Sequence, residues 1–231
     1  MDSLVCSCLA VIPIPFSQMK YKNLVFDFDG VLVESNEIKF NGFRRLFQGF
    51  PHDQVDELVT YAKANGGISR YEKIRYFYQK VRGEPITEES VQDLAARFSG
   101  LVRQEVVEAE PVKGSVEFLE QNATKFNLAL VSGSDQSELR GICREREIDH
   151  YFKGILGSPV KKKDNLARLL EDLGWKPSET VYIGDSQNDL EAARANRIDF
   201  IGRDSGLVEW DRLKIPSIPD LSSLADMLAR A

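Results

Sequence analysis

The sequence predicts an α/β fold, a doubly wound parallel sheet into which a helical bundle is inserted. After Pro111, short apolar runs alternate with helical segments, which is typical of such a sheet. Residues 34–108 instead show helical periodicity and no convincing strand, although a strand at residues 23–26 precedes them. We therefore predict an N-terminal extension of residues 1–18, a core domain of residues 19–33 and 109–231, and a helical domain of residues 34–108.

The extension is apolar from Leu4 to Phe16, but Pro13 and Pro15 interrupt it and no Lys or Arg precedes it. It is too short for a membrane span and lacks the basic start of a signal peptide. A formal net charge of -6 argues against a general binder of nucleic acid or anionic membranes. The 3 cysteines form neither a disulfide framework nor a zinc set, so we expect a reducing, cytoplasmic setting.

The helical domain is predicted to contain four short helices packed as a small bundle. Breaks are expected at residues 65–67 and 83–85, which are rich in glycine or contain proline. Ser69 and Glu72 form a capping-box pattern that starts the third helix, and Thr87 starts the fourth.

Beyond Pro111 the chain is predicted to alternate between helices and buried strands. The expected strands cover residues 127–131, 154–156, 180–184 and 199–202. The expected helices cover residues 116–121, 137–145, 163–173, 190–195 and 221–229, and Gly174 ends the third of them.

Two carboxylates, Asp27 and Asp29, directly follow the first strand. Residues at i and i+2 project to the same side of a strand, and Gly30 lets the backbone turn just beyond them. At ~4 Å and a protein-like dielectric, two such charges repel by roughly 4 kcal/mol. A cation or a proton must therefore accompany the pair, unless both residues only cap the next helix.

Polar residues also follow the other predicted strands. Each has an ordinary interpretation by itself, as a turn, a solvated basic loop or an acidic helix start. Ligands of an open parallel sheet bind beyond the carboxyl ends of its strands. Polar residues after several successive strands therefore predict one shared site. It would combine a nucleophile, a phosphate-binding hydroxyl, a cation and metal-binding carboxylates. The residues concerned are Asp27, Asp29, Ser132, Lys161 to Lys163, Asp185 and Asp189.

These residues resemble the four motifs of the haloacid dehalogenase (HAD) superfamily, in order, over residues 23 to about 220. The motif segments are Phe26-Asp27-Phe28-Asp29-Gly30-Val31, Val131-Ser132-Gly133-Ser134, Gly157-Ser158-Pro159-Val160-Lys161-Lys162 and Ile183-Gly184-Asp185-Ser186-Gln187-Asn188-Asp189. The resemblance implies a Rossmann-like core and identifies the helical insertion with the family's helical cap.

The resemblance also implies roles for individual residues. Asp27 would be the nucleophile that becomes an aspartyl-phosphate, and Asp29 the general acid and then base. Mg²⁺ would be held by the Asp27 carboxylate, the Asp29 backbone carbonyl and Asp185, with Asp189 in support. Ser132 and Lys162 would hold the phosphoryl oxygens, although Lys161 or Lys163 could replace Lys162. Gly133, Ser134, Arg70 and Lys39 are the expected substrate contacts.

The same resemblance narrows the reaction. Dehalogenases lack the second aspartate of the first motif and phosphonatases have a different residue there, whereas Asp29 is present here. The loop around Gly67 and Arg70 resembles the substrate loop of beta-phosphoglucomutase, unless Arg70 is only a surface residue at a helix start. Against the mutase, Lys39 stands where that enzyme has a histidine, and the fourth motif lacks its acidic pair.

We therefore expect a Mg²⁺-dependent phosphatase that acts on a small sugar phosphate or a phosphoglycolate-like metabolite. A phosphosugar mutase is the alternative, and a catalytically silent sugar-phosphate-binding protein is a remote one. A small phosphorylated metabolite is the expected partner, with no nucleic acid or membrane, in a monomer or homodimer.

Overall fold

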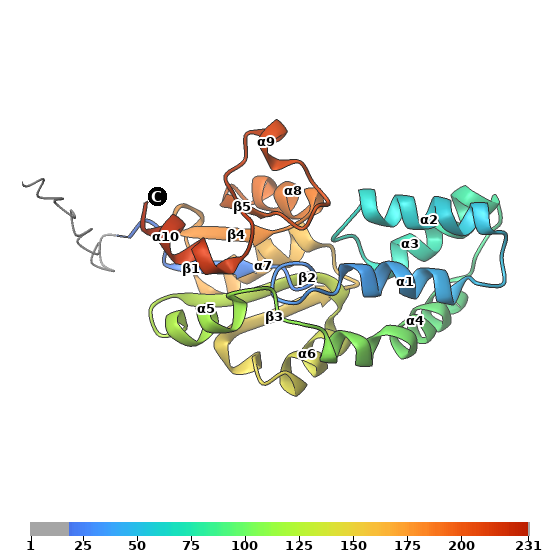
Figure 1. Ribbon diagram of the computed structural model, residues 1–231, viewed down its shortest axis with the longest axis horizontal. Helices are drawn as coiled ribbons and strands as arrows, with labels where there is room; N and C mark the ends of the chain where they lie inside the picture. Colours follow the sequence, from blue (N-terminus) through green and yellow to red (C-terminus); the bar gives the residue numbers. More distant parts are fainter. Residues whose placement is uncertain (1–18, 231) are drawn as a thin grey trace, which may run out of the picture.

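The structure is a computed structural model that describes residues 19–230, so the predicted extension lies outside the described residues (Figure 1). Six parallel strands form one sheet in the order β3-β2-β1-β4-β5-β6. Their bounds are β1 Asn23–Phe26, β2 Asn127–Asp135, β3 Phe152–Ser158, β4 Thr180–Gly184, β5 Asp199–Arg203 and β6 Ser217–Ile218. This order, with β1 inside the sheet, confirms the predicted doubly wound fold.

Helices cover both faces of the sheet because successive strand residues point to opposite sides. Leu24 and Phe26 pack on the side of α5 (Ser115–Asn122), α6 (Gln136–Glu145) and α10 (Leu224–Ala229). Val25 faces α7 (Lys162–Leu173) and α8 (Gln187–Ala195) on the other side. A three-layered core therefore holds the strand ends in fixed positions.

Several bounds differ from the prediction. β2 continues through the polar residues 132–134 to Asp135, which pairs with Ser158 after a register shift. The apolar pattern ends at Val131 although backbone pairing continues, so the strand end predicted from the sequence is too early. The short helix α9 (Trp210–Leu213) and strand β6 were not predicted, and residues 221–223 form a 3₁₀ turn before α10.

The inserted helices gather at one end of the molecule, beyond the sheet (Figure 1). They are α1 (Asn36–Leu46), α2 (His52–Ala64), α3 (Arg70–Tyr76), which continues into a π-helical segment Phe77–Arg82, and α4 (Glu88–Glu108). These helices enclose an apolar cluster of their own. We call them the cap, and the rest of the described chain the core; the predicted domain limits stay a prediction.

The predicted helix starts in the cap are confirmed. Ser69 Oγ accepts a hydrogen bond from the Glu72 amide at 3.3 Å, and Thr87 Oγ1 accepts one from the Ser90 amide at 3.1 Å. α4 has 21 residues and is longer than the short helix expected. Across residues 19–230, no helix has both the length and the apolar character needed to cross a bilayer.

Candidate active site

The carboxyl end of β1 carries Asp27 and Asp29 into a tight loop. Gly30 in this loop has a φ of 73°. A Cβ at this position would lie 2.1 Å from Asp185 Oδ2. Only glycine therefore allows the loop after β1 to pass so close to the carboxylate that follows β4.

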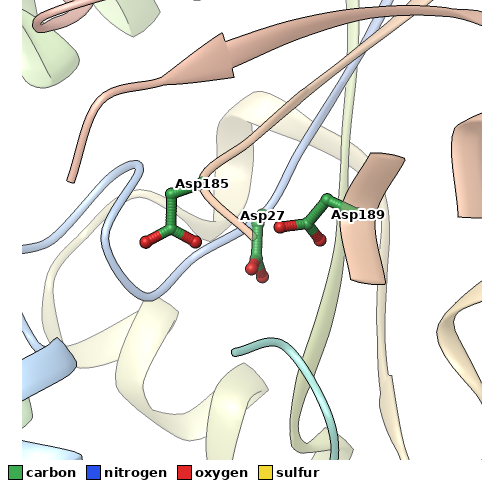
Figure 2. Close-up of side chains that lie close together, drawn as sticks. All are labelled: Asp27, Asp185 and Asp189. Carbon is green, nitrogen blue, oxygen red and sulfur yellow. The ribbon is translucent and has the colours of Figure 1, made fainter. Parts of the chain in front are cut away.

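Three buried carboxylates meet beside this loop: Asp27 after β1, Asp185 after β4, and Asp189 in the first turn of α8 (Figure 2). Each offers an oxygen, and these oxygens all lie within 4.8 Å of one another. The sheet order explains the meeting, because β1 and β4 are neighbours and their carboxyl ends lie at the same edge. The predicted convergence of strand ends is thus present.

Lys162 supplies the positive charge nearest to this cluster. Its Nζ lies 2.9 Å from Asp27 Oδ2 and also donates to Asp189 Oδ1. Asp189 accepts further hydrogen bonds from Tyr182 Oη at 3.1 Å and from the Ser186 amide at 3.0 Å. These bonds use both oxygens of Asp189. The Asp189 carboxylate is thereby held in place and keeps Lys162 next to Asp27, the candidate nucleophile.

The cluster is nevertheless short of positive charge, since one ammonium faces three carboxylates. Burial, with the charge of Asp189, raises the pKa of Asp27 to about 8 and that of Asp185 to about 7. A set of carboxylate oxygens with excess negative charge is what a hard divalent cation such as Mg²⁺ or Ca²⁺ requires. The residues present therefore fit a divalent metal ion.

Asp29 has a different set of partners although it is two residues from Asp27. Its carboxylate accepts hydrogen bonds from Ser35 Oγ at 2.6 Å and Ser134 Oγ at 2.7 Å, and Lys39 Nζ lies 3.2 Å away. Burial opposes ionisation, but the charge of Lys39 and the two hydroxyls outweigh it and lower the pKa of Asp29 below its usual range. Asp29 is thus held as a carboxylate by partners that Asp27 does not share.

Two cavities adjoin these groups and share Gly67, Ile68 and Gly133 in their walls. The inner cavity, of about 60 Å³, brings together most of the predicted site residues. Those residues are Asp27, Asp29, Lys39, Arg70, Ser132, Gly133, Ser134 and Asp185. The outer cavity, of about 170 Å³, is lined by Lys161, Lys162 and Lys163, among others. Asp189 lies behind Lys162 and lines neither.

Of the three consecutive lysines, Lys162 is buried and reaches Asp27, whereas Lys161 and Lys163 are exposed. The first turn of α7 places it there, because α7 begins at Lys162. The structure thus distinguishes the three lysines in a way that the sequence did not.

The cap closes over the inner cavity through its loop before α3. A Cβ added at Gly133 would lie 2.2 Å from the carbonyl oxygen of Gly67, so the two backbones are in direct contact. Lys39 of α1 donates to Ser134 Oγ at 2.7 Å, which joins cap and core at the same place. The cavity is therefore shared between the two parts.

Arg70 lies in the cavity wall, but its guanidinium is directed to α6. It donates to Glu138 Oε2 at 2.9 Å, to Glu138 Oε1 and to Ser99 Oγ. Burial opposes ionisation of Glu138, but Arg70 outweighs it and lowers the pKa of that carboxyl to about 2. Contact between Arg70 and substrate stays a prediction.

Sequence reasoning missed several residues of the site. Asn36 donates to Asp185 Oδ2 at 2.7 Å, and Tyr182 bonds Asp189 from within β4. Tyr182 places a hydroxyl between the apolar residues Val181 and Ile183 of this strand, which was a usable signal. Lys73, buried in the wall of the inner cavity, had no such signal, since it falls in an ordinary helical pattern.

Comparison with known proteins agrees with this geometry. A sequence profile of haloacid dehalogenase-like hydrolases matches residues 24–203. A phosphoglycolate phosphatase of Haemophilus influenzae is 25% identical over 193 residues, covering 79% of this chain and 85% of that protein. A phosphorylated carbohydrates phosphatase of Thermotoga maritima is 26% identical over 193 residues, covering 77% and 82%. A haloacid dehalogenase-like hydrolase from Streptococcus pneumoniae superposes with a TM-score of 0.68 at 20% identity, covering 90% and 99% of the two chains.

Proposed function

The chain belongs to the haloacid dehalogenase-like hydrolase family and is a phosphomonoester hydrolase, and we propose that it hydrolyses a small phosphorylated metabolite with Mg²⁺ through an aspartyl-phosphate at Asp27. The named activities of the two relatives, on phosphoglycolate and on phosphorylated carbohydrates, support this class of substrate.

One observation carries the proposal: Asp27 and Asp29 line the same cavity but have separate partners. Lys162 holds the Asp27 carboxylate, whereas hydroxyls and Lys39 hold Asp29. Two carboxylates in different environments can divide nucleophilic and proton-transfer roles between them. This division is what a two-step phosphoryl transfer requires.

In the first step, an oxygen of Asp27 attacks phosphorus and the bond from phosphorus to the leaving oxygen breaks. Asp29, which takes up a proton from solvent when the anionic substrate binds, gives this proton to the leaving oxygen, so that an alcohol departs. The lowered pKa of free Asp29 does not prevent this role, because a bound phosphate dianion places a like charge nearby and raises it. Ser132 and Lys162 hold the phosphoryl oxygens in place.

In the second step, water attacks the phosphorus of the aspartyl-phosphate. Asp29, now a carboxylate, takes a proton from this water, and the bond between phosphorus and Asp27 breaks. Inorganic phosphate leaves, and Asp27 returns to its starting state. The hydroxyls of Ser35 and Ser134 keep Asp29 directed at the cavity through both steps.

Asp27, Asp185 and the backbone carbonyl of Asp29 would hold Mg²⁺, with Asp189 fixing Lys162 beside them. When bound, the ion offsets the repulsion between an anionic nucleophile and an anionic phosphate. The charge deficit of the acidic cluster supports this assignment.

Lys39 favours hydrolysis over a mutase reaction. Its ammonium is paired with Asp29 and donates a hydrogen bond to Ser134. A mutase must reprotonate and redirect its intermediate, and the resembling mutase has a histidine at this position. An ammonium held by Asp29 and Ser134 offers no imidazole for that step.

Phosphate release from a panel of small phosphomonoesters, with Mg²⁺ and with EDTA, tests the proposal. The panel includes beta-glucose 1-phosphate, whose conversion to glucose 6-phosphate is followed in the same reactions. We expect metal-dependent phosphate release that Asp27→Asn abolishes. Conversion without net phosphate release would establish the mutase instead, and substantial activity of Asp27→Asn would exclude Asp27 as the nucleophile.

A further inference from the structure

Lys73 stands out among the charged residues of the inner cavity. It lies in α3 of the cap, is only 7% exposed, and lines the same cavity as Asp27 and Ser132. Its position places an ammonium group on the cap side of the space that the core supplies with the nucleophile. The question is what this charge contacts.

Three cationic side chains line the inner cavity: Lys39, Arg70 and Lys73. Lys39 is paired with Asp29, and Arg70 with Glu138. The side chain of Lys73 has no hydrogen bond or ion pair with any residue between 19 and 230. Its ammonium nitrogen lies 5.9 Å from the centre of the Phe43 ring. Lys73 is thus the cavity cation whose charge is not neutralised within the described chain.

An ammonium that lines a cavity without a hydrogen-bonding partner is stabilised when an anion binds beside it. Burial lowers the pKa of Lys73 to about 8. Asp29 is the strongest opposing influence, but its carboxylate oxygens already bind Ser35, Ser134 and Lys39. An anion that enters the cavity would supply the missing partner.

The phosphoryl group itself is an unsuitable partner for Lys73 in the proposed mechanism, because Asp27, Ser132 and Lys162 place it on the core side. The partner of Lys73 is therefore a second group of the same substrate. The inner cavity, of about 60 Å³, is smaller than the outer one, of about 170 Å³, so we expect a short link between the two groups.

The remaining walls restrict the substrate further. Phe40, Phe43 and Phe98 line the cavity beside Lys73 and offer no hydrogen bonds to the hydroxyls of a sugar. Aromatic rings beside a cation without a partner suit a short carbon chain that ends in an anion better than they suit a polyol.

We propose that Lys73 binds a second anionic group of the substrate and so selects short phosphate monoesters of this kind over neutral ones. This assignment rests on the phosphatase function proposed above. Two sources of the anion share this chemistry, a carboxylate and a second phosphate, and the cavity size favours the carboxylate. Lys73 is then a specificity residue, distinct from the groups that break the bond.

The test compares three substrates with the same two-carbon backbone: 2-phosphoglycolate, 2-hydroxyethyl phosphate and ethylene glycol bisphosphate. The quantity measured is the selectivity, the ratio of kcat/KM for an anionic substrate to that for 2-hydroxyethyl phosphate. We expect Lys73→Met to lower the selectivity for 2-phosphoglycolate at least tenfold, mainly through KM, because a charge-assisted contact is lost. Lys73→Arg, which keeps the charge, should recover part of it.

Lys80→Met is the matched control, since Lys80 is an exposed lysine in the π-helical segment of the same cap. It should keep the wild-type selectivity. Lys73→Gln is a second substitution that removes the charge. Thermal unfolding of each variant shows whether a loss of selectivity comes from the lost contact or from loss of the fold. A larger loss of selectivity for the bisphosphate than for 2-phosphoglycolate would identify the second anion as a phosphate.

Unchanged selectivity in active Lys73→Met and Lys73→Gln would overturn the assignment and leave the phosphatase function intact. If the wild-type enzyme released phosphate neither from these substrates nor from the wider panel described under Proposed function, the proposed function would fail instead. Calorimetric binding of 2-phosphoglycolate and of 2-hydroxyethyl phosphate to wild type and Lys73→Met would then decide the role of Lys73. Equal binding of 2-phosphoglycolate by both proteins would overturn it.

Discussion

Asp29 lines the inner cavity, and hydrogen bonds from Ser35 and Ser134 orient its carboxylate, which suits the proton transfers proposed for it. Asp29→Asn keeps the shape of the side chain but removes its ability to carry a proton. We expect kcat to fall at least ~100-fold, with a much smaller change in KM, because general acid-base catalysis contributes about that much. Steady-state phosphate release measures both constants.

Asp93→Asn provides the control for that substitution, because Asp93 is an exposed aspartate of α4. It should retain wild-type kcat. A value of kcat for Asp29→Asn within tenfold of the wild type would show that another group moves the proton.

At the scale of elements, two ion pairs connect cap helices to α6 of the core. Arg70 of α3 binds Glu138 in a nearly fully buried pair, and Arg103 of α4 binds Glu145 in an exposed one. Removing one partner of a buried pair leaves the other charge uncompensated and costs about 3 kcal/mol or more. The exposed pair is worth ~0.2–1 kcal/mol.

We therefore predict that Glu138→Gln lowers the free energy of unfolding by about 3 kcal/mol, whereas Glu145→Gln changes it by less than ~1 kcal/mol. Urea unfolding of both variants beside the wild type gives these values. Similar losses in the two variants would mean that burial does not distinguish the pairs.

The buried pair also predicts a pH dependence. The pKa of Glu138 is lowered to about 2 from 4.5, so its ionised form stabilises the folded state. This contribution is complete above pH 4.5 and is lost as the pH falls toward 2. The wild type should therefore lose more stability than Glu138→Gln between pH 5 and 3, and parallel curves would contradict the assignment.

Sequence patterns predicted the strand ends that local residue order determines. They missed the contacts between residues that are far apart in the chain. Apolar runs that end at Asp27 and Asp185 located both strand ends, because a buried strand needs apolar residues on both faces. The pairing of Arg70 with Glu138 joins residues 68 positions apart, and no local pattern records it. For the same reason Lys73 was not recognised as a cavity residue.

At the scale of the whole molecule, the acidic cluster should couple metal binding to folding. We expect Mg²⁺ to bind the folded chain beside Asp27 and Asp185, because only folding brings these carboxylates together. At a hundredfold excess over Kd, binding adds about 2.7 kcal/mol of stability. For a chain of this size that raises Tm by roughly 5–10 °C.

We predict this rise for metal-free wild-type protein on addition of Mg²⁺, with a much smaller rise for Asp185→Asn. Thermal unfolding followed by circular dichroism measures it without any substrate. Asp164→Asn, at an exposed position of α7, serves as the control. Equal rises in wild type and Asp185→Asn would place the metal elsewhere.

The proposed mechanism depends on a bond between Asp27 and phosphorus, and acid quenching during turnover would trap this bond. Peptides from quenched wild-type enzyme and from Asp29→Asn, which slows hydrolysis of the intermediate, are analysed by mass spectrometry. We expect one added phosphoryl group on the peptide that contains Asp27, and none on the same peptide of Asp27→Asn. A phosphoryl group on another residue, or full turnover by Asp27→Asn, would contradict it.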